Sequence, residues 1–174
     1  MFVANYGANS GAVDNDDGSS RYRIFDNFLI FGGHKNNFFG RQKESINNVM
    51  AYAGVYGARC AYFSDLPVLN SDPYGTLYNE VYVGNRCILG DSGDEYVHIN
   101  KDCDLKNATP PFTLTLRDNR VYAPAANVTF TCGSERLSFS DWLLAGLDSN
   151  TTVSDSPSTA EIISWGEALI FATP

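Results

Sequence analysis

The sequence has little positive charge. Lys and Arg number 12 against 20 Asp and Glu, and the formal net charge of the 174 residues is -8. This balance argues against nucleic acid as a partner, because no basic stripe exists to neutralise phosphates. It argues equally against binding to an anionic membrane surface.

Long apolar runs are also missing. No stretch approaches the length of a membrane span, and the first residues, MFVANYGANSG, lack the basic flank and apolar run of a signal peptide. The composition is nevertheless that of a folded protein, with 44% hydrophobic and 13% aromatic residues. At this length it predicts one domain with a real core.

Cysteines are few, and none of the four stands in a CxxC pair. An even set without metal-type spacing favours two disulfides over zinc. Three N-x-S/T sequons, at Asn107, Asn127 and Asn150, point in the same direction. Together these features predict a secreted, extracellular glycoprotein.

A short pattern recurs along the chain, in which an asparagine is followed by alternating apolar residues. It occurs at DNFLIF, NNVMAY, GNRCIL and DNRVYA, that is, at Asn27, Asn48, Asn85 and Asn119. Each segment is rich in β-branched or aromatic residues and is bounded by turn residues. The pattern predicts an irregular repeat of short strands.

The fold that we expect from this repeat is all-β, a right-handed parallel β-helix. Coils of such a solenoid stack about 4.8 Å apart, so that equivalent asparagines can form a hydrogen-bonded ladder. An antiparallel sandwich is the alternative, but it does not require an asparagine before each strand. The residues expected to point into the core are Phe28, Ile30, Val49, Ala51, Cys87, Leu89 and Val121.

Two helices are expected near the end of the chain. Ser138 and Gly146 bound a short one over 139–145, and Ser158 with Glu161 forms a capping box for another. We therefore expect β-helix coils with loop insertions over 1–137 and a helical cap of the same domain over 138–174. The first coil has no comparable cap, which predicts that another β-helix chain or segment stacks on it.

The disulfides are expected to close insertions between neighbouring coils. Cys60 and Cys87 bracket one insertion, and Cys103 and Cys132 tie the next to the final strand. Each bond would hold a loop that the short core cannot hold alone.

An acidic cluster, DNDDG, precedes the first repeat. A turn in which Asp side chains bond backbone N–H groups is the commonest explanation of such a sequence. Asp16 and Asp17 could instead face a carbohydrate, and Asp14 with Asp16 fits a calcium loop in part. No other cofactor and no other metal site is expected.

The stretch DNDDGSSRYRIFDNFLIFGGHK, with NNVMAYA after it, resembles carbohydrate-active proteins of the right-handed parallel β-helix (pectate-lyase-like) class. The pattern in that class is I-D-x-D-D-G-S-S-x-Y-x-I-Y-N-N, then a glycine pair, then K-x-x-E-G-F. β-Xylosidase-type glycoside hydrolases are the nearest enzymes. LSFSDWLLAGLDSNTTV resembles the closing segment of such β-helices, and the two matches cover roughly 12–54 and 132–170.

The resemblance implies a glycosidase in which Asp16 and Asp17 supply the acidic half of the catalytic site. A retaining glycosidase needs two carboxyl groups about 5 to 5.5 Å apart. The partner glutamate of the family falls close to Phe38 in this chain, and no carboxylate lies between Asp26 and Glu44. Hydrolysis is therefore not the first expectation.

Basic and aromatic residues near the glycine pair are candidates for substrate binding. His34, Lys35 and Arg41 follow Gly32 and Gly33, and Tyr22 belongs to the resembling stretch; these four are predicted to line one groove with the aspartates. A polysaccharide lyase would need such a base and cation, whereas tyrosines stack on sugar rings. His98 is expected to be a surface or insertion residue, and neither histidine has a partner at metal-ligand spacing.

Three functions remain open on the sequence. The first is a secreted β-helix glycoprotein that binds or forms part of a glycan-rich or surface structure without efficient catalysis. The second is a glycoside hydrolase or polysaccharide lyase that acts on cell-wall or matrix polysaccharide. The third is an assembly subunit that stacks end to end with another β-helix chain.

Overall fold

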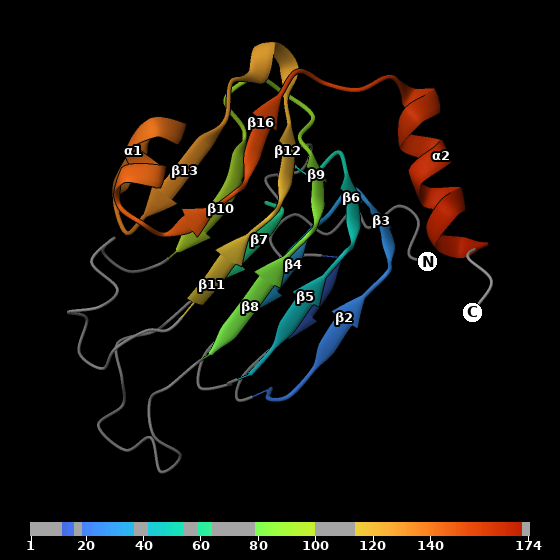
Figure 1. Ribbon diagram of the computed structural model, residues 1–174, viewed down its shortest axis with the longest axis horizontal. Helices are drawn as coiled ribbons and strands as arrows, with labels where there is room; N and C mark the ends of the chain where they lie inside the picture. The colour runs from blue at the N-terminus through green and yellow to red at the C-terminus, as the bar shows by residue number, and fades with distance from the viewer. Residues whose placement is uncertain are drawn as a thin grey trace.

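The computed structural model describes residues 12–15, 19–36, 42–53, 59–63, 79–99 and 114–171. Their strands form three sheets, in which each sheet takes one strand from every coil (Figure 1). We call them sheets A, B and C, with the strands given below. The chain runs from sheet B to sheet C to sheet A and then begins the next coil. Among the described residues this gives five coils, and the expected parallel β-solenoid is confirmed.

The strands are short and pair in parallel, except for β14, which runs antiparallel to β13. Sheet B contains β1 (Val13–Asn15), β4 (His34–Asn36), β7 (Ala61–Phe63), β10 (Glu95–Ile99), β13 (Thr129–Cys132) and β14 (Glu135–Leu137). Sheet C contains β2 (Arg23–Phe25), β5 (Glu44–Ile46), β8 (Glu80–Val83), β11 (Leu114–Arg117) and β15 (Asp148–Ser149). Sheet A contains β3 (Phe28–Ile30), β6 (Val49–Ala51), β9 (Arg86–Ile88), β12 (Arg120–Tyr122) and β16 (Thr152–Ser154).

The predicted asparagine ladder lies at the corner between sheets C and A. The side-chain oxygen of each asparagine accepts from the backbone N–H of the asparagine one coil earlier, at 3.0 Å for Asn48 and 2.9 Å for both Asn85 and Asn119. In the fifth coil Thr151 takes the same position and accepts from Asn119 N.

The residue before each of the four asparagines and before Thr151 is in the left-handed region, with φ between 53° and 67° at Asp26, Asn47, Gly84, Asp118 and Asn150. Asp, Asn and Gly tolerate this conformation better than other residues, which explains their recurrence at this turn.

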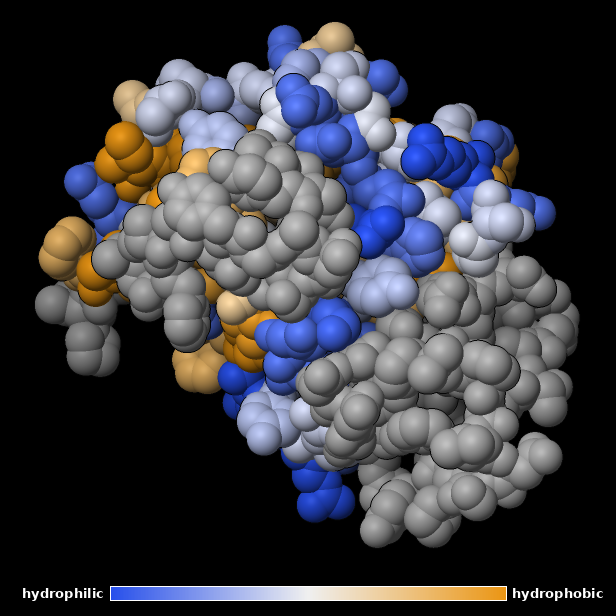
Figure 2. Space-filling view, turned by 180° about the vertical axis from the view of Figure 1, so that it is seen from behind, coloured by the Kyte–Doolittle hydropathy of each residue, from blue (hydrophilic) through white to orange (hydrophobic). Residues whose placement is uncertain are grey.

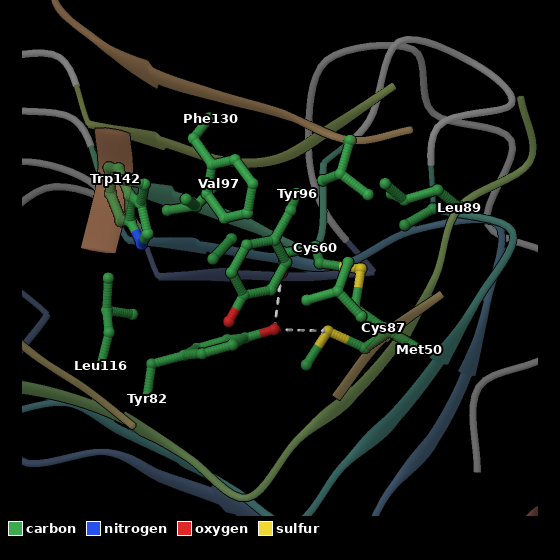
Figure 3. Packing of buried hydrophobic residues seen from close by; sticks show 14 of the residues in the cluster. Met50, Cys60, Tyr82, Cys87, Leu89, Tyr96, Val97, Leu116, Phe130 and Trp142 are labelled. Atoms are coloured by element: carbon green, nitrogen blue, oxygen red, sulfur yellow. Dashed lines mark hydrogen bonds between the residues drawn. A yellow bond between two sulfur atoms is a disulfide. The ribbon is translucent and has the colours of Figure 1, made fainter. Parts of the chain in front are cut away.

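Apolar and aromatic side chains from successive coils fill the interior of the solenoid, and Figure 3 shows part of this core. Tyr82 Oη donates to Met50 Sδ at 3.2 Å, and aromatic rings continue from Tyr82 through Tyr96 and Phe130 to Trp142. Cys87, Leu89 and Val121 are buried in this core as predicted.

The inward row of sheet A differs from the prediction in its first two coils. Leu29 and Met50 belong to the interior core, whereas Phe28, Ile30, Val49 and Ala51 belong to a second cluster outside sheet A. These strands are apolar on both faces, so alternation alone gave the wrong register.

Both expected helices form. The shorter one, α1 (Phe139–Leu144), has Ser138 as its N-cap, and α2 (Thr159–Ile170) begins with the Ser158–Glu161 capping box. Trp142 of α1 is fully buried against Phe130, so α1 covers the end of the core at the last coils. No helix of the described residues is long and apolar enough to cross a membrane.

The position of α2 explains the second apolar cluster. Figure 1 shows this helix alongside β3 and β6, where Ile162, Trp165 and Leu169 pack on the outer face of sheet A. A Cβ at Gly166 would lie 2.5 Å from the Phe28 ring, so glycine permits the close approach. The helix thus covers a side of the solenoid and not its end. The segment expected as a helical cap also supplies β15 and β16.

The Cys60–Cys87 disulfide is confirmed. It joins β9 to the residue before β7 across the interior of one coil, with a Cα–Cα distance of 5.9 Å. Cys132 is not a free thiol. Cys103 lies outside the described residues, and its pairing with Cys132 stays a prediction.

We expect the double replacement Cys60→Ala, Cys87→Ala to lower the free energy of unfolding by about 3 kcal/mol. The bond closes a loop with a sequence separation of 27, and a cross-link of that size restricts the unfolded chain by roughly this amount. Urea denaturation followed by circular dichroism measures the change. Equal midpoints for the two proteins would show that the bond does not stabilise the coil.

Candidate functional site

The sequence-predicted site residues do not come together on one surface. His34 is 1% exposed and points into the solenoid, whereas its neighbour Lys35 points outward from sheet B and pairs with Asp14, Nζ to Oδ2, at 2.9 Å. Tyr22 is exposed and lies next to β2 of sheet C. Asp16, Asp17, Phe38 and Arg41 lie outside the described residues.

His34 belongs to a buried polar cluster at the first coils. Asn15 Nδ2 donates to His34 Nε2 at 2.6 Å and to Asn36 Oδ1 at 3.2 Å. Burial, and secondarily the charge of Lys43, lowers the pKa of His34 to about 3. This histidine is therefore an interior, neutral residue and cannot contact a polymer on the surface.

A buried ion pair lies close to this cluster. Lys43 Nζ is 3.3 Å from Glu80 Oε1, and both side chains are 2% exposed. Burial raises the pKa of Glu80 to about 7, although the charge of Lys43 acts to lower it. Burial likewise lowers the pKa of Lys43, although the charge of Glu80 acts to raise it. The pair joins two neighbouring coils at the start of their sheet C strands, because Lys43 directly precedes β5 and Glu80 is the first residue of β8.

The outer face of sheet B carries the candidate site. The parallel register places one outward residue of each coil in a single row along the solenoid: Asp14, Lys35, Tyr62, His98 and Thr131. Arg59 and Glu95 flank this row, because Arg59 is paired with Glu95 and its guanidinium lies over the Tyr62 ring, 5.3 Å from the centroid. We call these seven residues the sheet B face.

Glu95 is the centre of the polar contacts on the sheet B face. It accepts from Thr131 Oγ1 at 2.5 Å, lies 3.3 Å from His98 Nδ1 and pairs with Arg59. Burial alone would raise the pKa of Glu95, but these three partners lower it to about 2. The carboxylate is thus ionised at every physiological pH, and it orients His98.

The rings of Tyr62 and His98 lie side by side on this face. Their centroids are 5.2 Å apart and the rings are tilted by 58°. The side chains of His98 and of the charged residues around the two rings are 13–32% exposed. The face is therefore partly enclosed. Such a set offers an aromatic surface beside fixed donors and acceptors.

The longest connections in the chain are those that link a sheet B strand to a sheet C strand. The segments between sheet B and sheet C strands are 16–22, 37–43, 64–79, 100–113 and 133–147, while each corner between sheets C and A is a residue pair such as Asp26–Asn27. In solenoids, insertions on one side often border the binding surface.

Seen from behind, the described surface is largely hydrophilic at its middle, and apolar residues gather on the side that carries α2 (Figure 2).

Sequence reasoning did not bring the seven residues of this face together. His98 was expected to be a surface or insertion residue, and Arg59, Glu95 and Thr131 were not considered. For the row itself the signal is the outward polar or aromatic residue of each sheet B strand, but it becomes visible only once the register is known. Asp14, which was considered for calcium, pairs with Lys35, and no cluster of metal-binding residues occurs in the described ranges.

Comparison of the chain with protein-family models, curated proteins and solved structures finds no significant match.

Proposed function

We propose that this protein is a secreted glycan-binding β-solenoid that holds its ligand on the sheet B face. The observation that carries the proposal is the row formed by the ring of Tyr62, the imidazole of His98 and the flanking ion pairs. Aromatic faces stack on sugar rings, and oriented polar groups fix the hydroxyls around them. The resemblance of the N-terminal stretch to carbohydrate-active β-helix proteins supports the same function.

Secretion is supported by the disulfide and by the sequons. Asn127 and Asn150 are both exposed, and each donates one hydrogen bond to a neighbouring coil, to Ser92 Oγ and to Asp118 Oδ1 respectively. Asn107, the third sequon, lies outside the described residues. An oxidising compartment fits the Cys60–Cys87 bond.

Replacing Tyr62 with alanine should weaken glycan binding about tenfold or more, because loss of a stacking ring costs roughly 1.4 kcal/mol or more. Isothermal titration calorimetry against xylan, β-glucan and pectin oligosaccharides measures the effect. Phe25→Ala is the matched control, since Phe25 is an exposed aromatic residue of sheet C. Equal loss in both variants would place the site elsewhere.

Polysaccharide cleavage is a second candidate function, favoured by the contact between Glu95 and His98. The carboxylate contacts Nδ1 and so orients the ring, which makes Nε2 the nitrogen that could take a proton from a substrate. An assay for released reducing ends and unsaturated products tests it. A cleaving enzyme would lose far more turnover than glycan affinity in His98→Gln, whereas a binding protein releases no product.

A further inference from the structure

We infer that the ligand of the sheet B face is a neutral glycan, a chain of uncharged sugars that lies along the solenoid axis. The inference rests on the proposed function and adds to it the chemical class of the ligand and its direction.

The charges of the sheet B face point away from an anionic polymer. Both cations of the face already contact a carboxylate, Lys35 at Asp14 and Arg59 at Glu95. A uronate or sulfate would have to compete with these carboxylates for the cations and then lie beside them. The chain as a whole carries a net charge of -8, which repels an acidic polymer further.

The same pairs suit uncharged sugars. A sugar hydroxyl both donates and accepts a hydrogen bond, so it can bridge a carboxylate oxygen and a neighbouring N–H group. Because Glu95 is held by three partners, its oxygens are fixed before any ligand arrives. A preorganised face of this kind loses little conformational entropy on binding.

The register determines the direction of the ligand. Lys35, Tyr62 and His98 come from successive coils, and neighbouring strands of a sheet lie about 4.8 Å apart. An extended β-linked glycan advances by a similar distance with each sugar. Consecutive sugars can therefore meet consecutive coils when the chain lies along the row.

The test compares xylohexaose and cellohexaose with hexagalacturonate by calorimetry on the full chain, at about 0.05 M and 0.5 M salt. We expect a neutral oligosaccharide to bind with a Kd that changes less than about twofold between the two conditions, because no net charge is neutralised. Hexagalacturonate should bind at least about tenfold more weakly.

Tighter, salt-sensitive binding of hexagalacturonate would overturn this inference and leave the proposed function standing. Binding of none of the three probes would overturn both.

A charge variant gives an independent measurement. Glu95→Gln removes the carboxylate charge that faces Arg59 but keeps an oxygen for Thr131, and it should tighten hexagalacturonate binding several-fold. Glu135→Gln makes the same change at an exposed position of β14 and should leave binding as it is. An unchanged hexagalacturonate affinity in Glu95→Gln would show that the ion pairs do not select the ligand.

Discussion

Replacing Asn85 with leucine is expected to lower the free energy of unfolding by ~3–6 kcal/mol. Asn85 lies in the middle of the ladder and is fully buried. Its Oδ1 accepts from Asn48 N and Asn48 Nδ2, at 2.9 and 3.0 Å, and its Nδ2 donates to Ser45 O at 2.9 Å. Leucine has a similar volume but removes the acceptor of the Asn48 backbone N–H and the donor to Ser45 O, while Asn48 Nδ2 keeps Ile24 O and Ser45 Oγ.

The matched control is Asn27→Leu, at the first coil. Asn27 donates to Asn48 Oδ1 and Phe25 O, while its own Oδ1 accepts no hydrogen bond within the described residues. The Asn27 backbone N–H still satisfies Asn48 Oδ1 in the variant. The control should therefore lose only about 1 kcal/mol, and urea denaturation of the three proteins measures the difference. Similar losses at Asn85 and Asn27 would mean that the ladder adds nothing beyond local turn geometry.

The ladder could be predicted from the sequence because its cause is local. Each coil needs a left-handed residue followed by a side chain with both a donor and an acceptor, and pairs such as Asp26–Asn27 and Asn47–Asn48 supply both. The fifth position escaped prediction because Thr151 replaces asparagine there. A hydroxyl accepts the last N–H and donates to Asp148 Oδ1 at 2.6 Å, which ends the ladder.

The faces of sheet A could not be predicted by alternation. In β3 and β6 every residue is apolar, since one face fills the core and the other receives α2. A helix more than a hundred residues away in sequence thus decides which positions must be apolar. Alternation is informative only for strands with one solvated face.

The sheet B face could not be predicted from the sequence for a different reason. Lys35, Tyr62 and His98 are neighbours in space, but insertions of unequal length separate them in the sequence. Only the pairing of β4, β7 and β10 brings them into one row. His34 shows the opposite case. It is next to Lys35 in the sequence and was predicted to share its site, but successive residues of a strand point to opposite faces, so His34 points inward and Lys35 outward.

Acid is expected to destabilise the protein through His34. The pKa of His34 is about 3 in the folded protein, because burial excludes the charged ring and Lys43 adds repulsion, and it returns to about 6.5 in the unfolded chain. The unfolded state therefore binds the proton first as the pH falls below about 6.5. Each pH unit down to about 3 removes roughly 1.4 kcal/mol of stability, so that ~3 kcal/mol is lost by about pH 4.

Other groups titrate in the same range, and a difference measurement separates them. Glu80 acts in the opposite direction, since its folded pKa of about 7 lies above the unfolded value and favours the folded state as the pH falls. His34→Gln keeps an acceptor for Asn15 but binds no proton. The free energy of unfolding of this variant relative to the wild-type protein should rise by ~3 kcal/mol between about pH 7 and pH 4.

Urea denaturation at a series of pH values gives this difference directly. A constant difference between His34→Gln and the wild type at all pH values would show that His34 takes up a proton in the folded protein as readily as in the unfolded chain. The interior polar cluster would then be open to water, and His34 would again be available to a ligand.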